Sequence, residues 1–164
     1  MRNVTTSKTL AIVLLVAACG SSSSSDDASK FVGVWTFDSG TITATCSGGL
    51  PGGSFPLTGL TGTITRTDNT HIRLTANASC VIDFTVSGST AMVVTSPPQS
   101  CTLNTPTLGP QQIAINMWTM TLTGTTMSAT ISGTALAGVC TASGSGSLSQ
   151  HGGTDGGASD ASSG

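Results

Sequence analysis

Between residues 31 and 149, apolar and polar residues alternate over short segments separated by Gly, Pro and Asn. Alternation with a period of two is typical of half-buried β-strands, because successive side chains of a strand point to opposite faces. The clearest case spans residues 60–76, where small or apolar residues recur at every second position before and after Asp68 and Asn69. This segment predicts a β-hairpin that turns at those two residues.

Other segments predict a series of similar strands. A second hairpin is expected to join residues 80–86 to residues 91–95 around Gly88 and to stop before Pro97. The longest strand is predicted over residues 112–123, with a bulge near Asn116 that reconciles apolar positions on two faces. The remaining predicted strands cover residues 31–37, 41–46, 127–135 and 140–148.

About eight or nine short strands joined by tight turns predict an all-β fold. We expect a small antiparallel β-barrel of about eight strands that follow one another as a meander. Closure is favoured because it removes the free sheet edges at which proteins self-associate. A two-sheet β-sandwich is the alternative, since the small inward residues of segment 127–135 suit either architecture.

The N-terminus has a different pattern. Arg2 and Lys8 precede an apolar run over residues 10–18, which is less than half the length of about 20 residues that a membrane-spanning helix needs. A basic start, a short apolar run and small residues at a cleavage point are typical of a secretory signal peptide. Val16-Ala17-Ala18-Cys19 resembles the lipobox of bacterial lipoproteins, which implies that residues 1–18 are removed and that Cys19 carries a lipid anchor.

The segments on either side of the strand-rich region lack large apolar residues. Residues 19–30 hold a serine run and are interpreted as a flexible tether, and residues 150–164 are interpreted as a disordered tail. The expected β domain therefore covers residues 31–149. Gly20 follows Cys19 where lipoproteins kept at the inner membrane tend to have Asp, so the resemblance implies an outer-membrane lipoprotein of the cell envelope, facing the periplasm or the surface.

The segment Phe31-Val32-Gly33-Val34-Trp35 resembles the Gly-x-Trp motif that opens the first strand in the lipocalin and wider calycin group. The resemblance implies a lipocalin-like barrel, with Trp35 across its closed end and a small apolar ligand inside. That family commonly places a basic side chain of the last strand against the Trp, and here no Lys or Arg follows Arg73. The layout as a whole also resembles uncharacterised lipoproteins of the myxobacterial type, which implies no particular activity.

Four cysteines remain when Cys19 is set aside, and an exported chain with an even set is expected to form disulfides. Sequence alone allows three connectivities. The second predicted hairpin favours Cys80–Cys101, because Cys101 follows that hairpin closely and the bridge would clasp its open end. Cys46 and Cys140 would then join the first strand region to the last and lock the barrel.

The composition offers little for catalysis. Charged residues make up only 7% of the chain and Glu is absent, no Gly-x-Ser-x-Gly elbow occurs, and no closely spaced His or Cys pair could begin a metal site. We therefore expect no catalytic residue, no metal and no cofactor. Four polar residues cluster at the tip of the first hairpin and form a possible recognition site for an anionic group: Arg66, Asp68, His71 and Arg73.

Three functional hypotheses follow. A chain with 5 basic and 7 acidic residues lacks the positive surface that binds nucleic acid. The leading hypothesis is a non-catalytic envelope protein, held at the membrane by its lipid, whose β domain contacts an envelope polymer or a protein. The second is a barrel that binds a small apolar ligand, and the third is a hydrolase or an enzyme inhibitor. An apolar cavity in the barrel would favour the second hypothesis.

Overall fold

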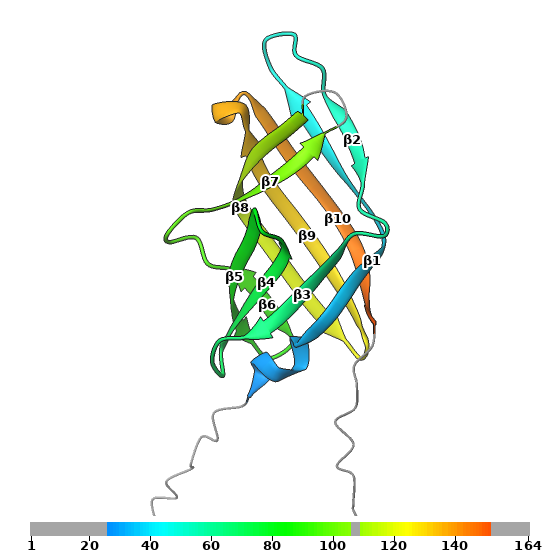
Figure 1. Cartoon of the computed structure of the whole chain (residues 1–164), viewed down its shortest axis with the longest axis vertical. Coiled ribbons are helices and arrows are strands. Elements are labelled where there is room, and N and C mark those ends of the chain that lie inside the picture. Colours follow the sequence, from blue (N-terminus) through cyan, green and yellow to red (C-terminus); the bar gives the residue numbers. More distant parts are fainter. Residues whose placement is uncertain (1–25, 106–108, 152–164) are drawn as a thin grey trace, which may run out of the picture.

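The computed structural model describes residues 26–105 and 109–151, and strands make up most of them (Figure 1). The elements occur in this order: η1 (Asp27–Phe31), β1 (Gly33–Cys46), β2 (Gly53–Pro56), β3 (Thr61–Arg66), β4 (His71–Asn77), β5 (Cys80–Ser87), β6 (Thr90–Val93), β7 (Gln99–Thr105), β8 (Gly109–Thr123), β9 (Thr126–Ala135), η2 (Leu136–Gly138) and β10 (Cys140–His151). Both η elements are short 3-10 helices. The predicted signal peptide, Cys19, tether residues 20–25 and tail residues 152–164 lie outside the described residues.

The last strand closes the sheet by pairing with the first. The antiparallel register of β1 and β10 runs from Val34 opposite His151 to Cys46 opposite Cys140. The predicted barrel is therefore confirmed, and the sandwich alternative is wrong. The closed antiparallel barrel has eight strands, namely β1, β3, β4, β5, β6, β8, β9 and β10.

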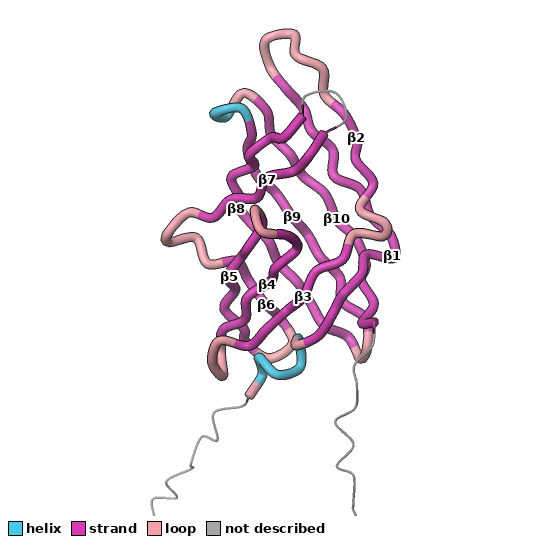
Figure 2. Tube along the Cα trace, in the orientation of Figure 1, coloured by secondary structure: helices cyan, strands magenta, loops and turns pink. Residues whose placement is uncertain are grey.

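Two extra strands lengthen the barrel wall at the end away from η1 (Figure 2). The first half of β1 pairs with β3, and its second half pairs with β2 along the same edge. In the same way β8 pairs with β7 near its start and with β6 near its end. The barrel is thus fully closed near η1, and six strands continue the wall beyond it.

The first strand differs from the prediction of two separate segments. β1 is continuous from Gly33 to Cys46, with a register shift between Phe37 and Ser39. It passes a tight corner at Gly40, whose φ of 137° is unfavourable for other residues and where a Cβ atom would lie 2.7 Å from the Cα of Gly146. Glycine lets the strand bend around the barrel without breaking its pairing with β10.

The predicted bulge in the long strand is confirmed. The register between β8 and β9 shifts between Ile115 and Met117. As a result Ile115 and Trp118 are both buried, while Met117 points outward and is 43% exposed. One extra residue thus brings apolar side chains from both halves of β8 into the barrel.

The β domain begins earlier than residue 31, because η1 belongs to it. Ala28 and Phe31 are fully buried, and the Asp27 carboxylate accepts hydrogen bonds from the Gly88 amide at 2.9 Å and from Lys30 Nζ at 2.7 Å. The composition of residues 19–30 did not indicate this, because Ala28 is the one apolar residue in the described part of the segment, residues 26–30. The strand β10 likewise includes Gln150 and His151, which were assigned to the tail.

Candidate ligand cavity

Trp35 closes the barrel at the η1 end. It is 1% exposed, and its indole Nε1 donates a 2.7 Å hydrogen bond to the carbonyl oxygen of Phe31 in η1. On β10, Gln150 lies opposite Trp35, and its side-chain amide donates to the carbonyl of Val32 at 2.9 Å. These hydrogen bonds therefore connect β1, β10 and η1 around the Trp35 indole.

Above Trp35 the barrel holds an apolar cavity of about 110 Å³. Every barrel strand except β6 contributes to its wall, together with Cys101 of β7 and the loop between β2 and β3. Among the described residues that line it, only Thr61 and Ser143 have side-chain hydroxyls, and both residues are largely exposed. The interior is therefore suited to hydrocarbon and poorly suited to water.

The loop between β2 and β3 contributes two leucines to the cavity wall. Leu60 lines the cavity and is 50% exposed, whereas its neighbour in the loop, Leu57, is buried. Gly62, next to this loop, lets the Leu74 side chain approach its backbone closely: a Cβ at Gly62 would lie 2.6 Å from Leu74 Cδ1. We refer to Leu60 and the residues beside it in the loop as the mouth of the cavity.

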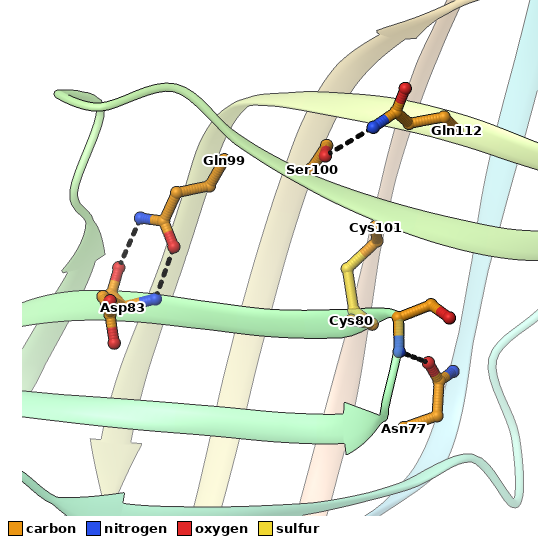
Figure 3. Close-up of a disulfide and its surroundings, with 8 residues drawn as sticks. Asn77, Cys80, Asp83, Gln99, Ser100, Cys101 and Gln112 are labelled. Carbon is orange, nitrogen blue, oxygen red and sulfur yellow. Dashed lines mark hydrogen bonds between the residues drawn. A yellow bond between two sulfur atoms is a disulfide. The ribbon is translucent and has the colours of Figure 1, made fainter.

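The Cys80–Cys101 disulfide forms part of the cavity wall. Its Cα atoms are 4.3 Å apart, and it joins β5 to β7 at the single register pair between these strands (Figure 3). Nearby, Gln99 bonds to both backbone groups of Asp83, accepting from its amide at 2.6 Å and donating to its carbonyl at 3.0 Å. The predicted bridge is thus present, and the side-chain amide of Gln99 supplements the pairing of β7 with β5.

The second predicted disulfide, Cys46–Cys140, is also present, with its Cα atoms 4.1 Å apart. It lies at the far end of the β1–β10 pairing, as the closure argument expected. The two disulfides therefore fix the barrel at two places. One is the pairing of β1 with β10, which we call the seam, and the other is the junction of β5 with β7.

Trp118 forms another wall of the cavity and has an unusual environment. It is 7% exposed, and its ring meets Phe84 edge to face, with centroids 5.6 Å apart and planes at 83°. Its Nε1 has no hydrogen-bond partner among the described residues. Buried donors are normally paired, because an unpaired one loses its bond to water without replacement.

The four residues of the predicted recognition tip do lie on one hairpin, β3–β4, but their charges are already paired. Arg66 bonds to Asp26, and Arg73 forms two hydrogen bonds with Asp83, at 2.7 and 3.0 Å. Asp68 contacts His71 Nδ1 at 2.9 Å. The arrangement ties the hairpin to its neighbours and leaves no unpaired arginine at the tip to bind an anion.

These contacts shift the carboxyl groups toward their charged forms. The pKa of Asp68 falls from 3.8 to about 2, mainly because the Thr70 amide donates a 2.7 Å hydrogen bond to the carboxylate, and secondly because of the His71 side chain. The Arg73 hydrogen bonds lower the pKa of Asp83.

Acid should therefore destabilise the hairpin. A carboxyl group whose pKa is lowered by folding stabilises the native state above its unfolded pKa, and this contribution is lost as the pH falls through the folded value. The free energy of unfolding should accordingly decrease from about pH 4 toward pH 2. The Asp68→Asn variant keeps an acceptor for Thr70 but cannot titrate, so its urea unfolding should depend less steeply on pH in this window. An unchanged slope would contradict this assignment.

Within the described residues, no group of three or more His, Cys, Asp or Glu side chains is placed to hold a metal ion. Asp68 and His71 meet at the hairpin turn, and Asp68 Oδ1 also accepts a 3.1 Å hydrogen bond from the hydroxyl of Thr70. Asp68 therefore acts as the organising residue of the turn.

The sequence did not reveal the cavity or the attachment of η1. The cavity depends on small residues at inward positions, such as Gly133 and Ala142, and their spacing was also compatible with close sheet packing. The hydrogen bond between Asp27 and the Gly88 amide had no signal in the sequence, because the two residues are 61 positions apart.

No protein-family model, curated protein or solved structure matches this chain.

Across residues 26–105 and 109–151, no helix has the length and apolar character to cross a membrane.

Proposed function

We propose that this chain is a non-catalytic, lipid-anchored protein of the bacterial cell envelope whose barrel binds a small apolar ligand. The observation that carries the binding function is the apolar cavity of about 110 Å³ inside the closed barrel. The lipobox-like sequence ending at Cys19 supports the anchor, and the Gly-x-Trp sequence ending at Trp35 supports a lipocalin-like use of the barrel.

The cavity volume sets the size of the ligand. An apolar protein cavity of about 150 Å³ can hold benzene, and pockets for drug-sized molecules are about 300–1,000 Å³. A cavity of about 110 Å³ therefore suits a slender aliphatic chain of a few carbon atoms. Each methylene group that leaves water contributes about 0.8 kcal/mol, so a chain of about five carbon atoms would bind with a dissociation constant on the order of 1 mM.

The anchor would orient the barrel. The chain enters the domain at Asp26 beside η1, seven positions after Cys19. Seven residues span at most about 25 Å. A lipid on Cys19 would therefore place the closed η1 end toward the membrane and the end with β2 and β7 away from it.

Binding can be tested with the chain from residue 20 onward, which lacks both the predicted signal peptide and the lipidated Cys19 and therefore needs no detergent. Only two tryptophans occur in the chain, Trp35 and Trp118, and both line the cavity, so n-alkanes from pentane to octane should change the intrinsic fluorescence in a saturable way. Affinity should rise with chain length until the cavity is full and then level off.

A cavity-filling variant provides the matched comparison. Ala142 lines the cavity opposite Gly133, so the three additional carbon atoms of Ala142→Leu have room to enter the empty space. This variant should bind the alkanes at least tenfold more weakly. Thr141→Leu changes the exposed neighbour and should bind like the parent protein. Equal binding by all three proteins, or no saturable signal, would contradict the proposal.

The anchor is tested separately by metabolic labelling with a palmitate analogue. The protein should be labelled, Cys19→Ala should abolish the label, and Ser21→Ala should retain it. Label that persists in the Cys19 variant would show that the lipid is attached to another residue.

A further inference from the structure

The strand pairing of the barrel wall is interrupted beside the cavity, between the loop that joins β2 to β3 and the end of β4. The register pairs of β3 with β4 end at Thr63 opposite Thr75, so the first residues of β3 have no register partner on β4. On the loop side, β2 pairs with β1 alone among the described strands. Beyond the end of β4 the wall continues in β7, which pairs with β5 and β8. A gap in the strand pairing therefore separates the mouth of the cavity from the end of β4.

The lining of the cavity reaches this gap from both sides. Leu60, Thr61 and Gly62 line the cavity from the mouth and the start of β3, and Leu74 and Ala76 line it from β4. Leu60, Thr61 and Ala76 are also exposed to solvent. Three features therefore coincide at this gap: a residue that lines the cavity, exposure of that residue, and the lack of a strand pair.

No other place in the described part of the wall combines these three features. Ser143 is the remaining exposed residue of the lining, but it has register partners on both sides, Thr43 on β1 and Ser132 on β9. The junction of β5 with β7 has a single register pair, but Cys80 and Cys101 at that pair are joined covalently and are only 3% and 4% exposed. A small molecule can therefore cross the wall beside the mouth without breaking a strand pair or a disulfide.

Apolar side chains fill the gap, and the backbone around it is fixed. Leu74 is buried and lies against the backbone of Gly62. The loop is bonded to β1, because the Phe37 amide donates to the Leu60 carbonyl at 2.9 Å and the Gly59 amide donates to the Phe37 carbonyl at 2.8 Å. The Leu60 side chain is 50% exposed, and exposed side chains change rotamer within nanoseconds. The movable part of the mouth is therefore this side chain.

We propose that the apolar ligand enters and leaves the barrel through this gap, and that the Leu60 side chain is the gate that controls its passage. This inference rests on the proposed binding function and adds the route to the cavity. Rotation of the Leu60 side chain toward solvent opens the gap while the strand pairs and both disulfides stay intact. Substitution of Leu60 should therefore change the rates of binding more than the affinity.

The test measures the exchange of n-hexane by NMR line-shape analysis, with the chain from residue 20 onward as the parent protein. Leu60→Ala shortens the gate, so association and dissociation should both become about fivefold faster, with less than about a twofold change in the dissociation constant. Leu50→Ala is the matched control. Leu50 is a leucine of similar exposure, 43%, in the loop between β1 and β2, and it does not line the cavity. Its exchange rates should equal those of the parent protein.

A change on the opposite side of the gap provides an independent variant. Ala76→Leu places a larger side chain across from the mouth and should slow association about fivefold. Thr75 is the exposed neighbour of Ala76 and does not line the cavity, so Thr75→Leu should exchange hexane like the parent protein.

The outcomes distinguish the route from the binding function. Hexane that binds Leu60→Ala and Ala76→Leu with the exchange rates of the parent protein would overturn the route and leave the binding function standing. Equal acceleration by Leu60→Ala and Leu50→Ala would also overturn the route, because it would reflect a general loosening of the loops. If hexane does not bind the parent protein, the binding function fails and the route fails with it.

Discussion

Removing the Cys46–Cys140 disulfide should lower the free energy of unfolding by about 4–5 kcal/mol, the largest effect expected of any single change in this chain. The bridge closes a loop with a sequence separation of 94 residues, and a covalent link across such a loop greatly restricts the unfolded chain. It also joins the end of β1 to the start of β10, where the barrel closes. The measurement is urea unfolding of the Cys46→Ala/Cys140→Ala double variant.

The second disulfide is the matched comparison. Cys80 and Cys101 are 21 residues apart, for which the same reasoning gives about 3 kcal/mol. The Cys80→Ala/Cys101→Ala variant should therefore lose less stability than the seam variant. The opposite order would mean that the packing of this bridge in the cavity wall outweighs the entropy of the unfolded chain.

Truncation of Trp35 should have the next largest effect. Trp35→Ala should destabilise the protein by about 3–5 kcal/mol, because a large and almost fully buried side chain is removed from the closed end of the barrel. Trp35→Phe retains most of the apolar contact and loses the hydrogen bond to Phe31, so about 1–2 kcal/mol is expected. Both values are to be obtained by chemical unfolding with the disulfides intact.

The neighbouring residue supplies the control for this prediction. Val34 is 40% exposed on the outer face of β1, and Val34→Ala should change the stability by less than about 0.5 kcal/mol. A loss for Trp35→Ala no greater than that for Val34→Ala would mean that η1 and Trp35 do not hold the end of the barrel together.

The sequence predicted the barrel because strand periodicity is a local property. Ile82, Phe84 and Val86 alternate with exposed or half-buried residues, and these three side chains are indeed buried in β5. The seam was predictable because a closed meander brings the first and last strands together, which left Cys46 and Cys140 as partners. The bulge near Asn116 followed from the change of apolar face within one strand.

Features that depend on contacts between distant segments were not predictable. The continuity of β1 through Gly40 depends on the close approach of Gly146 on β10. The place of η1 depends on the amide of Gly88, 61 residues from Asp27 in the sequence. The cavity likewise arises from the difference between the barrel volume and the summed volume of its side chains. The alternation of apolar and polar residues along the sequence does not reveal this difference.

The position of the two chain ends determines how the domain would respond to a pulling force. The chain enters β1 and leaves β10 at the same end, where Val34 lies opposite His151. Tension between these points would separate the hydrogen-bonded pairs of the seam one after another, since each pair is loaded only when the previous one has opened. The separation would stop at the Cys46–Cys140 bond, so the 94-residue loop behind it could not be extended until that bond is reduced.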